Sequence, residues 1–307
     1  MAITAQDVKK LRELTGAGMM DAKKALVETE GDFDKAVELL QIKGLGKAEK
    51  KADRVAAEGL VDAAISSDKK SGAIVEVNSE TDFVARNEEF IAFVRQLAQQ
   101  AIDANAADAD ALLASTIDGE TVDAMRQKRI ATIGENITVR RVERIDLSGN
   151  GIVVDYTHNG NISALVAIDA QADVAANEAV AELARDIAMH VAAMNPQFAK
   201  AEDIDPEVVE AQTRIETEKA IESGRPANIA EKMVTGRIAK WKQEICLTSH
   251  PFVKNGDLTV AQEIERVANE TGIKLSLNKF IRVVRGEGIE KAETMSYAEE
   301  VAAALKG

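Results

Sequence analysis

The chain has 307 residues, enough for roughly two to four compact units that each have a core of their own. Hydrophobic residues make up 46% of it but aromatic residues only 3%, a balance typical of helix-rich packing. The formal net charge of −14 argues against general binding to nucleic acid, because an acidic surface repels phosphate backbones. The expected partner is therefore a protein or a small molecule.

Cys246 is the single cysteine of the sequence, so no internal disulfide can form. The sequence shows neither a charged leader followed by an apolar segment nor an uninterrupted apolar run of about 18 residues. These features favour a cytoplasmic protein that neither is secreted nor enters a membrane.

The first 54 residues form a separate helical unit in this interpretation. Thr4 and Asp7 have the spacing of a capping box, a second short helix is predicted from about Met19 to Thr29, and Asp32 is placed to cap a third. The segment "KGLGKAEKKADR" at 43–54 follows, with five basic residues and two glycines. It resembles a flexible, basic linker.

A strand at Ile74–Asn78 precedes the stretch "NSETDFVARNEEF" and a helix whose Phe90, Val94, Leu97 and Ala101 lie at helical spacing. The hydrophobic pattern further predicts a helix near Thr121–Ile133 and strands at Ile137–Ile145, Ile152–Thr157 and Ile162–Asp169. The turn "SGNG" between the first two of these strands predicts that they form a hairpin.

One segment of the core is repeated. "AIVEVNSETDF" from Ala73 matches "ALVAIDAQADV" from Ala164 without a gap, and both run into helical patterns. The match predicts two related α+β subdomains. Asp82, which we expect to cap the following helix, has its counterpart in Asp173, whereas the phenylalanine at position 83 is replaced by Val174. A ring that the scaffold does not need, held on a β-to-α turn, would suit a pocket of another protein.

Towards the C-terminus, Asp205 and Pro206 are predicted to start a helix that turns back at "SGRP", with Asn228 capping the return. The thin apolar stripe of this antiparallel hairpin suits a protruding arm that can pair with a second chain. An amphipathic helix at Val260–Glu270, a strand within "IRVVRGEGIE" and a helix from Ser296 complete the predicted elements.

The common signatures of catalysis are missing from the sequence. "GAGMMD" lacks the third glycine of a dinucleotide-binding turn, and "GLGK" lacks the spacing of a phosphate-binding loop. The three histidines, His158, His190 and His250, fall in different segments without metal-ligand spacing. No hydrolase motif is present. We expect no enzyme activity, no metal and no cofactor.

Five longer motifs follow one another along the chain. They are "VKKLRELTGAGMMDAKKAL" at 8–26, "VNSETDFVARNEEF" at 77–90, "IGENITVRRV" at 133–142, "IAMHVAAMNPQF" at 187–198 and "HPFV" at 250–253. In this order they resemble the bacterial elongation factor Ts family over essentially the whole chain. The resemblance implies an α+β protein with an N-terminal three-helix module of ubiquitin-associated-like fold, two related core subdomains, a protruding antiparallel helical hairpin and a C-terminal module.

The implied division of the chain follows the same order. It consists of a helical module with its linker at 1–54, a core N-subdomain at 55–140, a core C-subdomain at 141–200 and 229–263, a dimerisation arm at 201–228 and a C-terminal module at 264–307.

The resemblance implies guanine nucleotide exchange on elongation factor Tu during translation elongation. It places "TDFV" against the partner's nucleotide domain, where this segment disturbs the helices that support Mg²⁺. The implied contacts are Thr81, Asp82, Phe83 and Val84 at this tip, Ile133, His158 and Val253 elsewhere in the core, and Met19, Met20 and Lys23 on the N-terminal module. The implied partners are elongation factor Tu and, through the arm, a second copy of the chain.

Two other functions compete with exchange at this point: a passive helical adaptor whose hairpin only dimerises, and an enzyme that uses a nucleotide. The missing phosphate-binding loop weakens the enzyme, and the added ring at position 83 weakens the passive adaptor.

Overall fold

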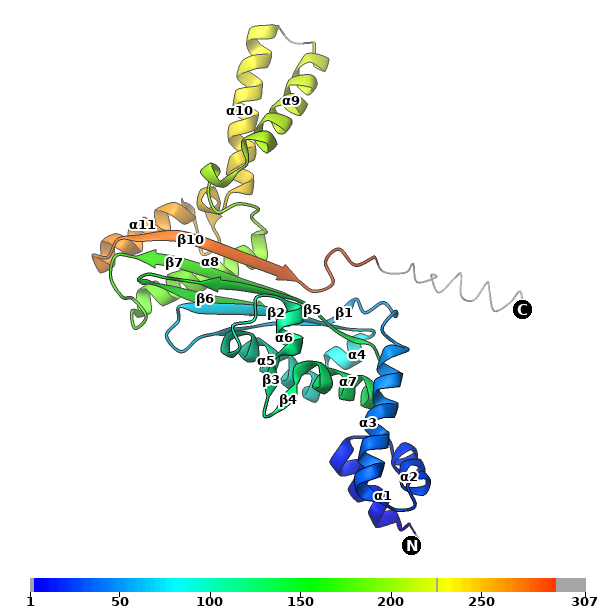
Figure 1. The fold of residues 1–307 in the computed structure, drawn as a ribbon. Coiled ribbons are helices and arrows are strands. Elements are labelled where there is room, and N and C mark those ends of the chain that lie inside the picture. The colour runs from blue at the N-terminus through cyan, green and yellow to red at the C-terminus, as the bar shows by residue number, and fades with distance from the viewer. Residues whose placement is uncertain (1–2, 225, 291–307) are drawn as a thin grey trace. The chain divides into compact units, whose positions relative to one another are not determined.

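The computed structural model describes residues 3–224 and 226–290 (Figure 1). It has a mixed α+β fold that begins with helices and continues into two three-stranded sheets with helices against them. The described residues divide into two compact units. One contains residues 3–62, 75–142 and 284–290, and the other contains residues 63–74 and 143–283.

The N-terminal helices are α1 (Ala5–Thr15), α2 (Met19–Glu28) and α3 (Phe33–Glu49). The predicted capping box is confirmed, since the Thr4 hydroxyl accepts a bond from the Asp7 N–H and the Asp7 carboxylate accepts one from the Thr4 N–H. Asp32 caps α3 as predicted, because its carboxylate accepts a bond from the Lys35 N–H. The helices enclose a small aliphatic core made of Val8, Leu11, Ala22, Ala25, Leu26 and Ala36.

The interpretation of 43–54 as a flexible linker is wrong for its first half. Helix α3 continues to Glu49, so Gly44 and Gly46 lie inside the helix. Gly44 approaches α7 (Val122–Ile133) closely, and a methyl group at this glycine would stand 3.3 Å from the Cβ of Ala131. The glycine that resembles a linker residue in the sequence thus permits close packing of two helices.

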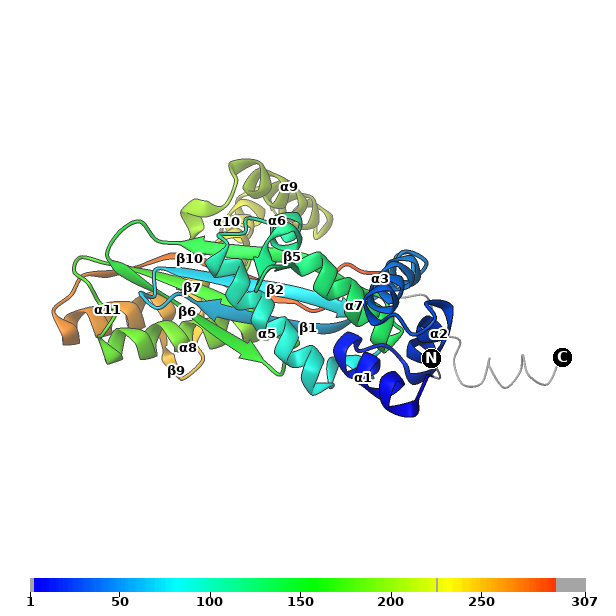
Figure 2. The same cartoon turned by 60° about the horizontal axis from the view of Figure 1, so that its bottom comes forward.

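The first sheet has the strand order β1-β2-β5, formed by β1 (Glu58–Ile65), β2 (Ser71–Ser79) and β5 (Ile137–Asp146). Helices α5 (Glu88–Asp103) and α7 lie across one face of it (Figure 2). Helix α5 turns Phe90, Phe93 and Leu97 inward, and all three side chains are buried. Between these helices lie α6 (Ala109–Ala114) and the short strands β3 (Thr116–Ile117) and β4 (Glu120–Thr121).

The second sheet has the order β10-β7-β6, with β6 (Gly151–His158), β7 (Ile162–Ala170) and β10 (Leu275–Val284). Strands β6 and β7 form an antiparallel hairpin in which Gly151 pairs with Asp169 and His158 with Ile162. The predicted hairpin at "SGNG" is therefore wrong, because β5 and β6 belong to different sheets. The hydrophobic pattern predicted the positions of both strands correctly, but it does not show with which strands they pair.

Helices α8 (Glu178–Met194) and α11 (Val260–Thr271) supply the core of the second sheet with aliphatic side chains. Among them are Ile187 and Val191 of α8 and Ile264 of α11. Short strands β8 (Pro251–Phe252) and β9 (Asn255–Thr259) pair with each other just before α11. Strand β10 begins before the predicted strand at 281–290 and ends within it, and the predicted helix from Ser296 lies outside the described residues.

Helices α9 (Pro206–Glu222) and α10 (Ala227–Ile245) form the predicted antiparallel hairpin. Asp205 caps α9 and Pro206 is its first residue, as expected. Asn228 does not cap the return, because α10 already begins at Ala227 after Pro226. The second helix continues to Ile245, beyond residue 228, where the predicted arm ends.

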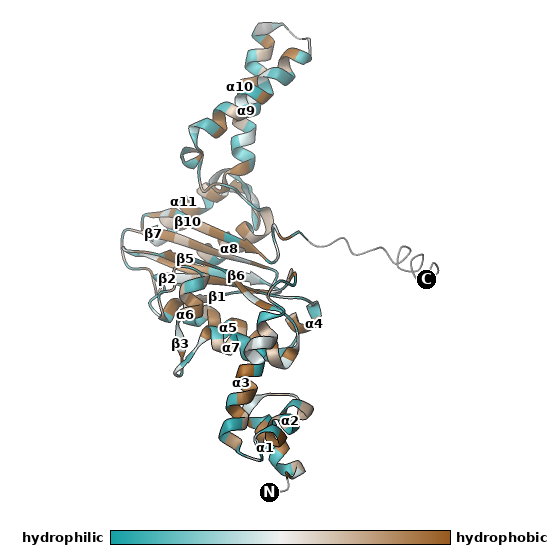
Figure 3. Cartoon of the chain, turned by 45° about the vertical axis from the view of Figure 1, so that its right-hand side comes forward, coloured by the Kyte–Doolittle hydropathy of each residue, from teal (hydrophilic) through white to brown (hydrophobic). Residues whose placement is uncertain are grey.

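The hairpin is mostly polar with scattered apolar residues (Figure 3). Its buried carboxylate, Glu216, accepts bonds from Lys219 at 2.8 Å and from Arg237 of the opposite helix at 3.1 Å. A small aliphatic cluster joins the helices and consists of Ala220, Ala230 and Val234, with Ile238 packed against it.

Candidate protein-binding site

The most exposed large hydrophobic side chain in the described part of the chain is Phe83, at 80% relative exposure. It belongs to the short helix α4 (Asp82–Ala85), which follows β2. The next two residues of the same turn, Val84 and Ala85, are buried. One face of α4 therefore anchors the turn while the ring of Phe83 points to solvent.

A carboxylate on another segment fixes the start of this turn. Glu135 Oε1 accepts a hydrogen bond from the Thr81 hydroxyl at 2.6 Å, and Oε2 accepts one from the Thr81 N–H at 2.9 Å. The Ser79 hydroxyl donates to the Thr81 carbonyl at 2.9 Å. The N–H, the hydroxyl and the carbonyl of Thr81 are thus all hydrogen-bonded, to Glu135 on one side and to Ser79 on the other. Thr81 directly precedes α4, the helix that carries Phe83.

Glu135 is itself held by its neighbours. The Asn136 N–H donates to Glu80 Oε1 at 2.6 Å, and the buried Asn136 amide donates to the carbonyls of Ala52 and Arg54 at 3.2 and 2.8 Å. Gly134, at the C-terminal cap of α7, has a φ of 88° that favours glycine. A tight left-handed turn therefore aims the Glu135 carboxylate at Thr81.

The predicted role of Asp82 as a helix cap is wrong. Asp82 lies in the first turn of α4, and its carboxylate forms an ion pair with Arg86 at 2.8 Å. The cap of α5 is Asn87, whose side chain accepts bonds from the N–H groups of Glu89 and Phe90. The short helix α4 therefore precedes α5, which begins one turn later than a cap at Asp82 predicted.

The repeat partners differ in the structure as well. Val174 is buried, whereas Phe83 is exposed. Asp173 accepts a bond from the Ala175 N–H at 3.1 Å and pairs with Lys70 at 3.5 Å, so it too caps no helix. The burial of Val174 agrees with the inference that the scaffold needs only a modest apolar group at this point, while the ring at position 83 is an addition.

Ile133 is the last residue of α7 and is half-buried. It lies two residues before Glu135, whose carboxylate binds Thr81, so the structure brings Ile133 and the Phe83 turn into one neighbourhood. Met19, Met20 and Lys23 lie at the start of α2 and are exposed. The spacing of Met19 and Lys23 places both on one face of this helix.

Two further predicted contacts lie in the second unit. His158 ends β6 and is exposed, and the Tyr156 hydroxyl lies 3.2 Å from its Nδ1. Val253 follows β8 and is 46% exposed. Its backbone N–H donates to Nδ1 of His190 at 3.2 Å.

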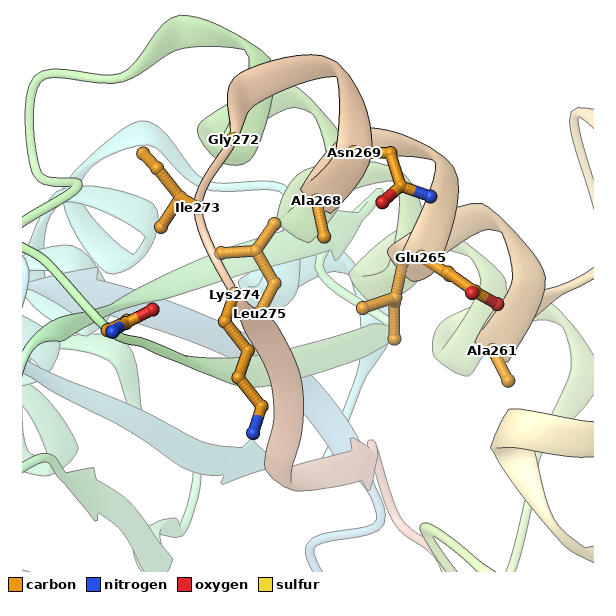
Figure 4. Close-up of a pocket in the computed structure, with 10 residues that line it drawn as sticks. Ala261, Glu265, Ala268, Asn269, Gly272, Ile273, Lys274 and Leu275 are labelled. Atoms are coloured by element: carbon orange, nitrogen blue, oxygen red, sulfur yellow. The ribbon is translucent and has the colours of Figure 1, made fainter.

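A surface pocket of about 490 Å³ lies between α11 and the start of β10 (Figure 4). Its walls combine aliphatic side chains such as Ala268 and Ile273 with the polar side chains of Glu265, Asn269 and Lys274. None of the contact residues that we predicted from the sequence lines this pocket.

Within residues 3–224 and 226–290, no cluster of three or more histidine, cysteine, aspartate or glutamate side chains is arranged to hold a metal ion. None of the helices in that part of the chain is both long and apolar enough to cross a bilayer.

Sequence reasoning missed the Glu135 clamp and the contact between His190 and His250. Thr81 and Glu135 are 54 positions apart in the sequence, and His190 and His250 are 60 apart. Only the fold brings the residues of each pair together. The glycine before Glu135 was the one local signal, because a glycine after a helical pattern predicts a C-terminal cap. It does not indicate where the next side chain points.

Comparison with known proteins gives a consistent result. The family profile described as elongation factor TS matches residues 80–287. The chain is 47% identical over 304 residues to elongation factor Ts of Clostridium perfringens, covering 98% of each chain. It is 48% identical over 313 residues to elongation factor Ts of Brucella anthropi, covering 100% of both, and 46% identical over 305 residues to that of Hydrogenovibrio crunogenus, covering 99% of this chain and 98% of the relative.

Proposed function

Since the chain belongs to the elongation factor Ts family, we propose that its exposed Phe83 ring enters elongation factor Tu and loosens the bound nucleotide. The protein is a guanine nucleotide exchange factor for elongation factor Tu in translation elongation, and it is not an enzyme. Membership of this family also places it in the cytoplasm.

The exposure of Phe83 on a clamped turn is the observation that carries this proposal. Exposure of an aromatic ring to water is unfavourable, so burial of the ring in a partner's pocket contributes strongly to the binding free energy. Val84 and Ala85 are buried and anchor the turn, so the Phe83 ring stays exposed and can contact a partner in a fixed position. A ring on a loose loop would lose part of its binding energy to the ordering of that loop.

The mechanism follows from thermodynamic linkage. An exchange factor that weakens GDP binding must itself bind less tightly to the GDP-loaded partner, because the coupling free energy is the same in both directions. If Phe83 separates packed helices of the partner, the Mg²⁺ site on those helices shifts with them. A phosphate that loses its cation is held less tightly, so GDP leaves sooner, and binding of GTP then expels the exchange factor.

We assign the remaining residues of the tip to positioning and contact. Thr81 takes the Glu135 clamp, Asp82 orders Arg86, and Val84 anchors the turn. Further proposed contacts with the partner are Ile133, His158 and Val253 from the core and Met19, Met20 and Lys23 from the N-terminal helices.

The finer architecture is also a proposal. We propose a ubiquitin-associated-like module with its linker at 1–54, related core subdomains at 55–140 and 141–200 with 229–263, an arm at 201–228 and a C-terminal module at 264–307. In the described part of the α9–α10 hairpin, the exposed large aliphatic side chains are Val208, Ile215, Ile221 and Ile229. Such side chains favour dimerisation of two copies through the arm.

A photo-crosslinking amino acid at position 83 tests the proposed contact. With benzophenone-alanine in place of Phe83, irradiation in the presence of elongation factor Tu and GDP is expected to join the two proteins, and the crosslinked peptide should come from the partner's nucleotide domain. The matched control carries the same group at Ile42, another exposed apolar position in the first unit. A crosslink from position 42 but none from position 83 would overturn the proposal.

A further inference from the structure

Two histidines of the second unit are in contact inside the protein. His190 of α8 is 0% exposed and His250, just before β8, is 5% exposed. His190 Nε2 lies 3.2 Å from His250 Nδ1, and the Phe252 ring stacks on His190 with centroids 6.2 Å apart. The proposed exchange mechanism makes no use of this pair.

The outer partners of the pair determine where its protons are. His250 Nε2 lies 2.8 Å from the Glu244 carbonyl oxygen, which can only accept, so this nitrogen carries a proton. The Val253 N–H donates to His190 Nδ1, so that nitrogen is bare. A neutral imidazole has one proton, which leaves His190 Nε2 as donor and His250 Nδ1 as acceptor in the central bond. All four ring nitrogens then take part in hydrogen bonds, and each bond is donated in the same direction along the chain, from Val253 through His190 and His250 to the Glu244 carbonyl.

This chain of hydrogen bonds has no place for an additional proton. The two bare nitrogens, one on each ring, already accept bonds from Val253 and from His190. A proton on His190 Nδ1 would place two N–H groups against each other and break the bond to Val253. A proton on His250 Nδ1 would face the N–H at His190 Nε2 and break the hydrogen bond between the two rings. Charging the pair therefore releases either the Val253 backbone or the contact between the rings.

The groups around the pair do not supply a compensating negative charge. The side of β6 and β7 that faces α8 is aliphatic. On α8, Asp186 is paired with Lys254 at 2.7 Å; at the end of α10, Glu244 is paired with Lys240 at 3.6 Å. On α11, Glu263 is paired with Arg266 at 2.7 Å. The buried Cys246 has a thiol pKa raised first of all by burial, so it is neutral.

We propose that His190 is a positioning residue, which holds the Val253 segment in place for the partner only while the His190–His250 pair is neutral, so that acid releases this segment. The contact of Val253 with elongation factor Tu rests on the proposed function above. The positioning itself depends only on the geometry of this chain. The consequence is a binding surface whose affinity for the partner falls below neutral pH.

The pKa of His190 supports the direction of this effect. Burial first, and then the neighbouring His250, lower it from 6.5 to about 4. A group whose pKa is depressed in the held state stabilises that state above the pKa of the free side chain. Its contribution is lost as the pH falls from 6.5 towards 4. With pKa values of 6.5 in the released state and about 4 in the held state, the equilibrium constant between held and released segment falls roughly tenfold from pH 7.5 to pH 5.5.

The first experiment uses the free, full-length protein and needs no partner. Nitrogen-15 NMR of labelled histidines is expected to show both rings at pH 7 in the tautomer that is protonated on Nε2 and bare on Nδ1. The Val253 amide signal should shift with the same midpoint as the His190 ring, below the ordinary histidine value of 6.5. A His190 ring protonated on Nδ1 at pH 7, or a Val253 amide that ignores the titration, would overturn the proposal.

The second experiment measures the affinity for nucleotide-free elongation factor Tu of wild type and of His190→Asn at pH 7.5 and 5.5. The asparagine oxygen can accept the Val253 N–H, but its amide does not titrate. Titration of the partner cancels in the ratio of the two affinities. The wild-type to variant ratio is expected to fall by more than about twofold and up to roughly tenfold between these pH values. A smaller fall would overturn the proposal.

If His190→Asn does not fold, the proposal is tested by the NMR titration of the wild-type protein, which needs no variant. If neither wild type nor variant binds at pH 7.5, the Phe83 proposal fails instead. The NMR titration still decides whether the pair holds Val253.

Discussion

Replacing Glu135 by alanine is expected to slow nucleotide exchange on elongation factor Tu by roughly tenfold or more, although this side chain carries no predicted contact with the partner. The carboxylate accepts two of the three hydrogen bonds that hold Thr81 at the start of α4. Without it, two donors lose their partner, which costs about 1–3 kcal/mol where they stay buried. The turn can avoid this cost only by moving, and Phe83 moves with it.

Two matched variants separate positioning from general damage. Glu135→Gln keeps one acceptor for the Thr81 N–H, so its exchange rate is expected between those of wild type and Glu135→Ala. Thr81→Val removes only the hydroxyl bond at 2.6 Å and is expected to have an intermediate effect as well. The measurement is the concentration of exchange factor that gives half-maximal GDP release, which should rise. Wild-type kinetics in Glu135→Ala would show that the clamp has no role in exchange.

The two phenylalanines at either end of "FVARNEEF" are expected to respond in opposite ways to alanine. Phe90 is fully buried on α5, and Phe90→Ala should lower the free energy of unfolding by about 3–5 kcal/mol because it leaves a cavity. Phe83 is 80% exposed, and Phe83→Ala should change it by no more than about 0.5 kcal/mol.

Urea unfolding followed by circular dichroism measures both changes under the same conditions. Phe83→Leu is a useful companion because it keeps an apolar side chain at the tip. A loss of several kcal/mol in Phe83→Ala would mean that the ring belongs to the core in solution, and the assignment of Phe83 as the partner-binding tip would be wrong.

Local signals predicted the helices well. The Thr4 capping box, the Asp32 cap and the Asp205-Pro206 start depend on residues close in sequence, and the structure has all three. The predicted helices near Thr121–Ile133 and Val260–Glu270 are confirmed within a residue. At these sites the backbone groups that need a partner find it within one turn.

Strand pairing was harder, because the partner of a strand is not encoded in its own pattern. Strand β1 was not predicted: its sequence "EGLVDAAI" lacks a clear alternation, and its second residue is Gly59, whose φ is 113°. A Cβ there would stand 2.1 Å from the Val77 carbonyl oxygen, so this strand depends on close backbone approach. The four residues between β5 and β6, "LSGN" at 147–150, are as compatible with a tight hairpin as with the connection between two sheets that they form.

The candidate site was predicted in part. The comparison of Phe83 with Val174 identified the ring as an addition to the scaffold, and the structure has Phe83 exposed and Val174 buried. The capping role expected for Asp82 belongs to Asn87, because the short helix α4 lies between Asp82 and the start of α5. Glu135 and the His190–His250 pair were beyond prediction, because their hydrogen bonds join residues that are distant in the sequence.

Stopped-flow release of fluorescent GDP from elongation factor Tu tests the central claim most directly. Catalytic amounts of the wild-type protein are expected to accelerate release, while folded Phe83→Ala should be slower by roughly thirtyfold or more, the effect of losing a binding hot spot of about 2 kcal/mol. Phe83→Leu should fall between them. A Phe83→Ala protein that accelerates release within about twofold of wild type would contradict the account.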